Sequence, residues 1–139
     1  MRNFQELNVV EIDAQNGILY IQATDATDTR PRLAMRREGS YLSISCSYGP
    51  LEIAMRPRYA EVTRTMGRLR PVQGLQTTRQ VGTGQAYLAL GLQEDGALVL
   101  RPTIVADATG HVVFNLLLTT AVRKELFAWL PVEEVPIST

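Results

Sequence analysis

The feature that most constrains the fold of this chain is an order of segments that occurs twice. In each half, runs of alternating apolar and polar residues lead almost directly into an amphipathic helical segment. Residues 51–55 enter a helix predicted over residues 57–66, and residues 114–118 enter one predicted over residues 120–130. A period of two residues is typical of half-buried strands, and a spacing of three to four is typical of helices. The chain therefore predicts a pseudo-two-fold β-β-β-β-α duplication.

The individual strands support an α+β fold in which antiparallel sheets pack on two amphipathic helices. Residues 32–37 and 41–47 form a predicted hairpin around the turn at Gly39, and residues 18–24 precede it as a further strand. Residues 86–92 and 97–105 form a second hairpin around Gly96. Residues 112–118 are the last predicted strand. We expect one domain over residues 17–130, with pseudo-repeats at 17–69 and 81–130 and a linker over 70–80. Residues 1–16 form an N-terminal segment without clear periodicity, and residues 131–139 form an acidic tail.

Composition excludes several classes of protein and site. The 139 residues contain one cysteine, Cys46, and one histidine, His111, so neither a disulfide framework nor a Cys/His zinc site is expected. No segment reaches the roughly 18–20 apolar residues of a membrane span, and the first residues lack the apolar core of a signal peptide, so we expect a cytoplasmic protein.

Catalytic motifs are also missing from the sequence. No serine lies in a Gly-x-Ser-x-Gly elbow, and no carboxylates or histidines are spaced for acid–base chemistry. The Gly82-Thr83-Gly84 segment precedes a strand, whereas phosphate-binding loops follow a strand and open a helix. We expect no enzyme, no metal and no cofactor.

The charge of the chain is zero overall but is distributed unevenly. Residues 30–79 contain ten arginines against three glutamates, whereas the segments before and after them are acidic. A local positive field of this kind attracts polyanions, and arginine has a planar fork for phosphate and a flat face for bases. Solvation of an ordinary surface by arginines is the alternative interpretation.

Alternation along the strands predicts which of these side chains share the polar sheet surface. Single-stranded nucleic acids are bound by aromatic rings that stack bases and by cations that track phosphates. Half-buried tyrosines of a sheet rim give the same pattern without a ligand. The candidate residues are Tyr20, Arg30, Arg32, Arg36, Arg37, Tyr41, Ser43, Arg56, Arg58, Tyr87 and Arg101.

With these features the chain resembles the Whirly family and the related positive-cofactor type of transcriptional coactivator. The resemblance covers residues 17–130 at the level of pattern. It rests on the hairpin around Glu94-Asp95-Gly96, the strand and helix over residues 113–130, and the strand–proline–helix junction from Ile53 through Pro57 to Tyr59. The lysine-rich segment typical of plant Whirly proteins is not present. The resemblance implies a homo-oligomer that binds single-stranded DNA across its β-surface in replication, repair, recombination or transcription.

These observations lead to two hypotheses of different classes. The first is a largely sequence-nonspecific protein that binds single-stranded DNA, or RNA, through an arginine and tyrosine sheet surface. The second is a protein-interaction or self-assembly module without a nucleic-acid ligand, in which open strand edges or an acidic partner cover the same surface.

Overall fold

A computed structural model describes residues 4–24, 30–72 and 79–133 of the chain. Strands make up 54% of these residues and helices 16%. The described part contains twelve strands in two sheets and only two helices. The prediction of two β-β-β-β-α repeats packed on amphipathic helices is therefore wrong, because the protein is mostly β.

The first sheet is a five-stranded antiparallel meander in the order β2-β3-β4-β5-β6. Its strands are β2 (Val9–Asp13), β3 (Ile18–Gln22), β4 (Arg32–Glu38), β5 (Tyr41–Tyr48) and β6 (Leu51–Met55). The predicted hairpin of β4 and β5 is confirmed, with Leu33 opposite Cys46 and Met35 opposite Ile44. Alternation along these strands buries one face of the sheet and leaves the other face polar.

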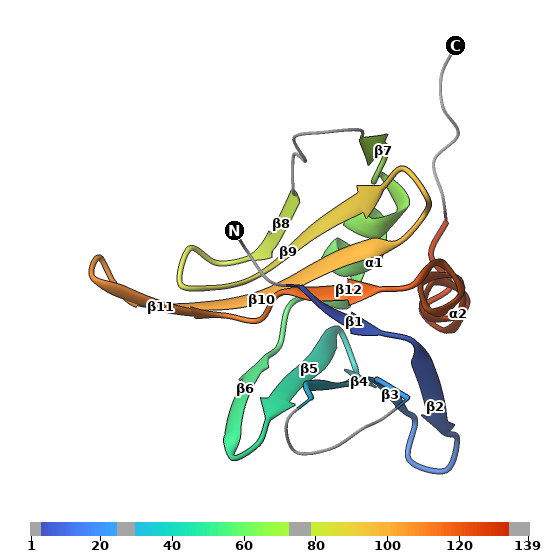
Figure 1. Ribbon diagram of the computed structural model, residues 1–139, viewed down its shortest axis with the longest axis horizontal. Helices are drawn as coiled ribbons and strands as arrows, with labels where there is room; N and C mark the ends of the chain where they lie inside the picture. The colour runs from blue at the N-terminus through green and yellow to red at the C-terminus, as the bar shows by residue number, and fades with distance from the viewer. Residues whose placement is uncertain (1–3, 25–29, 73–78, 134–139) are drawn as a thin grey trace.

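The second sheet is built around the hairpin of β9 (Ala86–Gln93) and β10 (Leu98–Asp107). Its order is β1-β12-β10-β9-β7, and β8 and β11 pair with β9 and β10 respectively. The remaining strands are β1 (Gln5–Leu7), β7 (Pro71–Val72), β8 (Arg79–Gly82), β11 (Gly110–Val113) and β12 (Leu116–Leu118). Figure 1 shows the β10–β11 hairpin extending away from the rest of the protein.

Three local features prevent the sheets from being copies of one another. The segment before residue 17 divides into β1, which pairs in parallel with β12, and β2, which pairs with β3 in the other sheet. The predicted strand over residues 112–118 is interrupted at Phe114 and Asn115, and its two parts pair with different halves of β10. The strand β7 also pairs in parallel with β9. The sheets thus differ in strand number and in pairing.

The helices do not form a common layer over the sheets. Helix α1 (Tyr59–Gly67) contacts β5 of the first sheet and β8 of the second, whereas α2 (Thr120–Trp129) lies beside β2 (Figure 1). One continuous cluster of buried apolar side chains joins both sheets and both helices. Among its members, Leu19, Met35 and Ile44 come from the first sheet, and Leu90 and Leu100 from the second. The β6–α1 connection crosses from one sheet to the other beside this core.

Two features of other protein classes do not occur in the described residues. No helix among them is long and apolar enough to cross a membrane. They also contain no group of three or more His, Cys, Asp and Glu side chains that could hold a metal ion. Most of the predicted acidic tail and the centre of the predicted 70–80 linker lie outside the described residues.

Candidate nucleic-acid interface

Several of the predicted residues lie on the polar face of the first sheet. Tyr20, Arg32, Arg36 and Ser43 alternate with buried neighbours such as Leu19, Leu33 and Leu42, so they lie on the face opposite the core. Arg36 lies directly opposite Ser43 on the adjacent strand. Small residues surround them, because Ala34 pairs with Tyr20 on one side and with Ser45 on the other. Small side chains therefore occupy the middle of this face.

Three arginines and one tyrosine gather where β4 ends and α1 begins, and we call them the arginine end. They are Arg36, Tyr41, Arg56 and Arg58. Tyr41 and Arg58 form a β-bridge, and the same register places Arg56 across from Ser43. All four side chains are exposed, and Tyr41 keeps 40% of its surface accessible. The pairing of β5 with β4 on one side and with the segment after β6 on the other brings these four side chains together.

The backbone fixes the two arginines that follow β6. Leu42 N donates to Pro57 O at 2.9 Å, and Tyr59 N donates to Ser40 O at 2.9 Å, so strand-like pairing with β5 continues beyond Met55. Alternation then turns Pro57 inward, where it is buried, and leaves Arg56 and Arg58 exposed. Arg58 is also the N-cap of α1, with the extended ψ of 131° that a helix start requires.

Most of the positive charge at the arginine end is not neutralised by ion pairs. Arg56 Nη2 lies 3.2 Å from Glu38 Oε2, an exposed pair of the kind that contributes little to stability. Among the described residues, Arg36 and Arg58 have no carboxylate within 4 Å. The guanidinium carbons of Arg56 and Arg58 lie 5.7 Å and 6.0 Å from the centre of the Tyr41 ring, at the long end of cation–π contact. The cluster thus offers cations around an accessible ring.

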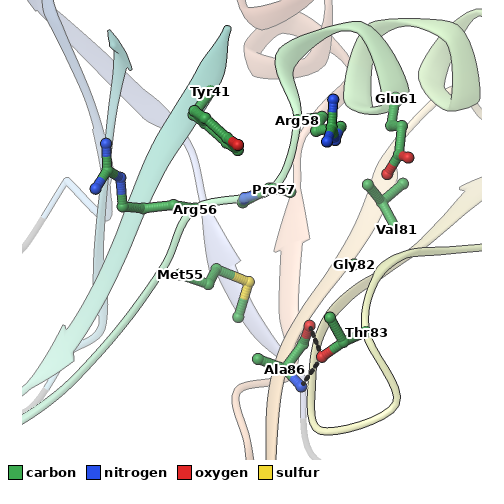
Figure 2. Close-up of a pocket in the computed structure, with 10 residues that line it drawn as sticks. All are labelled: Tyr41, Met55, Arg56, Pro57, Arg58, Glu61, Val81, Gly82, Thr83 and Ala86. Carbon is green, nitrogen blue, oxygen red and sulfur yellow. Dashed lines mark hydrogen bonds between the residues drawn. The ribbon is translucent and has the colours of Figure 1, made fainter.

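A cleft of about 370 Å³ adjoins the arginine end between the first sheet and the β8–β9 hairpin. Its floor is apolar, with Met55, Pro57 and Val81 contributing buried side chains. Its rim is polar, and Figure 2 shows Arg56 and Tyr41 on one side, Arg58 beside Glu61 at the start of α1, and Glu61 extending toward Val81. Gly82, Thr83 and Ala86 complete the lining. A cleft of this volume lies at the small end of the range for ligand pockets.

Three further predicted arginines are engaged elsewhere in the first half of the chain. Arg32 stacks 4.2 Å above the Tyr20 ring, which covers one face of that ring. Arg37 projects to the other side of the sheet, where it stacks 3.9 Å from the Tyr59 ring and donates to Gly39 O. Arg30 precedes β4 and donates to Gln5 Oε1 at 3.3 Å, about 20 Å along the strand from Arg36.

Tyr87 and Arg101 lie on the second sheet, away from the arginine end. They line a shallow groove of about 510 Å³ together with Thr103, His111 and other residues of β10 and β11. The Arg101 Nε donates to Asn115 Oδ1 at 2.9 Å, which fixes the side chain against the sheet. The register puts this groove on the face of β9 opposite the one that carries Leu88 and Leu90. Tyr87 and Arg101 are therefore not part of the arginine end.

Sequence reasoning missed the residues that complete the cleft. Glu61 looks like an ordinary acidic residue in the first turn of a helix, and Val81 lies in a short strand, β8, that begins inside the predicted linker and was not expected. Gly82 has φ +124°, and a Cβ there would lie 2.5 Å from Ala86 O, so the close β8–β9 turn requires glycine. The Thr83 hydroxyl accepts from Ala86 N at 3.0 Å and holds that turn. No local pattern pairs these residues with Tyr41, because their proximity is entirely tertiary.

Comparisons of the chain with family models, with curated proteins and with solved structures give no match. The resemblance to the Whirly family therefore stays a prediction.

Proposed function

We propose that this protein binds single-stranded nucleic acid at the arginine end and across the adjoining polar face of the first sheet. The observation that carries the proposal is that Arg56 and Arg58 lie beside the accessible ring of Tyr41, with Arg36 on the same face across Ser43. Arginine guanidinium groups bind phosphate in a bidentate manner, and an exposed tyrosine ring stacks a base regardless of its identity. Binding that is largely independent of sequence follows from these contacts.

The path of the strand follows from the positions of the cations. Arg32 lies nearer the start of β4 and Arg36 nearer its end, and Arg56 lies two strands away from Arg36 on the same face. Acidic residues Glu11, Asp13 and Glu52 lie on the outer strands β2 and β6. Repulsion from these carboxylates disfavours phosphates over the outer strands, and the carboxylate of Glu38, which lies opposite Tyr41, is paired with Arg56.

Fluorescence anisotropy with a labelled oligo-dT tests the proposal, with duplex DNA measured alongside. We expect salt-sensitive binding to the single strand and little binding to the duplex. The double variant Arg36→Glu/Arg58→Glu should weaken binding by about tenfold per arginine and reduce the salt slope by about 0.7 per lost phosphate contact. The control is Arg64→Glu/Arg68→Glu, which changes the net charge by the same amount. These two arginines lie near Pro131 at the end of α1, away from the arginine end. Equal loss in both double variants, or no binding at micromolar protein, would contradict the proposal.

A self-assembly or protein-interaction module is the second candidate, and the β5–β6 hairpin tip favours it. Tyr48 and Leu51 pair at this tip with 45% and 48% of their surfaces exposed, next to the open edge of β6. Exposed apolar residues beside an unpaired strand edge promote association between chains. Sedimentation without nucleic acid, read together with the anisotropy above, distinguishes the candidates: a stable homo-oligomer that is lost in Leu51→Lys, in a protein that binds no oligonucleotide, would support this one.

A further inference from the structure

We propose that the cleft beside the arginine end takes one base of the bound strand and that Glu61 makes the cleft prefer guanine. The proposal rests on the proposed function and adds a single position of base discrimination to binding that is otherwise nonspecific. It starts from the half-buried Glu61 carboxylate, which lines the cleft. Among the described residues, this carboxylate makes neither an ion pair nor a hydrogen bond.

The cleft has the composition of a base-binding site. Its floor of Met55, Pro57 and Val81 presents apolar surface to the flat face of a ring, and Tyr41 stands at the opening as a stacking partner. Gly82, which its φ and its contact with Ala86 O require to be glycine, adds no side chain to that wall. A volume of about 370 Å³ holds one nucleotide-sized group and not several.

The polar groups of the cleft distinguish between the bases. An ionised carboxylate accepts hydrogen bonds at both oxygens and donates none. The Watson–Crick edge of guanine offers two adjacent donors, N1–H and the N2 amino group, beside the O6 acceptor. Glu61 matches the two donors, and Arg58 begins the same helical turn three residues earlier and supplies a donor for O6. Thymine presents one N–H between two carbonyl oxygens, which a carboxylate repels.

Adenine and cytosine each provide one amino group next to a ring acceptor, so they satisfy only one carboxylate oxygen. Inosine keeps guanine N1–H and O6 but lacks the N2 amino group. The expected order of affinity for one substituted position is therefore guanine first, then inosine, then adenine and cytosine, and thymine last.

Competition anisotropy with oligo-dT strands that carry one central guanine, inosine, adenine, cytosine or thymine measures this order directly. We expect the strand with guanine to bind about tenfold more tightly than the all-thymine strand, with inosine between them. In Glu61→Gln the guanine-to-thymine affinity ratio should fall to about one. Glu52→Gln removes the same charge from the outer face of β6, outside the cleft, and should keep the wild-type ratio.

The outcomes separate this inference from the function on which it rests. Tight binding of all strands with equal affinity would overturn base selection at Glu61 and leave single-strand binding supported. A uniform rise in affinity for every strand in Glu61→Gln would also overturn it, because that result reports charge alone. Failure to bind any oligonucleotide would overturn the proposed function itself.

Discussion

Gly67 at the last turn of α1 is a residue whose side chain must be absent. It is buried, and a Cβ at this position would lie 2.1 Å from the carbonyl oxygen of Glu133. The obstacle is backbone from the segment after α2, which cannot rotate away. We expect Gly67→Ala to lower the free energy of unfolding by about 1–3 kcal/mol, measured by urea denaturation. Gly84→Ala is the control, since no heavy atom lies within 4 Å of its Cβ, and its change should stay within about 0.5 kcal/mol.

Burial determines the chemistry of the Cys46 side chain. The surrounding core raises the pKa of its thiol from 9.0 to about 12. The pKa of the Cys46 thiol is higher in the folded state than in the unfolded state. The neutral thiol therefore makes its full contribution to stability below pH 9. This contribution is lost as the pH rises from 9 toward 12. Compared with Cys46→Ala, the wild-type protein should lose about 1.4 kcal/mol of unfolding free energy per pH unit above 9. A difference between the two proteins that does not change between pH 8 and 10 would contradict this.

At the scale of elements, the start of α1 shows a conflict between stability and the proposed function. Arg58 is the N-cap of this helix and makes no side-chain capping bond, whereas Thr119 caps α2 by accepting from Val122 N at 3.4 Å. Arg58→Ser should cap α1 and raise the unfolding free energy by about 0.5–1 kcal/mol while it weakens oligonucleotide binding about tenfold. Thr119→Ala should cost about 1 kcal/mol and leave binding as it is. An Arg58→Ser variant that is both more stable and equally tight in binding would argue against the arginine end.

The elements also show what local sequence can and cannot predict. The strands β4, β5 and β6 and both helices were predicted to within two residues, because alternation and helical spacing are local properties. The strands β1 and β2 were missed because they are three and five residues long and carry no clear alternation. The interruption at Asn115 was missed because apolar residues continue on both sides of it.

The candidate site also contains some residues that local sequence predicts and others that only tertiary packing brings in. Alternation correctly placed Tyr20, Arg32 and Arg36 on the polar face. Alternation does not predict that Arg37 stacks on Tyr59 or that Tyr87 lies apart from Tyr41. Both arrangements depend on how elements from distant parts of the chain pack together. Glu61 joins the cleft only through the contact of α1 with β8.

At the scale of the whole molecule, the two sheets are linked by neighbouring residues of the N-terminal segment. Leu7 is fully buried in β1, which pairs with β12 of the second sheet, and its carbonyl accepts from Thr119 N at 3.2 Å. The next residue, Asn8, donates from its backbone N to Gln22 O at 3.1 Å in the first sheet. Since one core cluster includes side chains from both sheets, the sheets should unfold together.

Leu7→Ala tests this coupling, because it leaves a cavity where the two sheets meet. We expect a loss of about 2–5 kcal/mol in unfolding free energy. Fluorescence of Trp129, the single tryptophan, reports on α2, and hydrogen exchange of the β3 and β4 amides reports on the first sheet. Both probes should shift together to the same lower denaturant midpoint. Ile12→Ala, with half of its side chain exposed, should cost far less. If Leu7→Ala lowered only the Trp129 transition, the two sheets would be independent units, and the cleft between them would not be held rigidly enough to select a base.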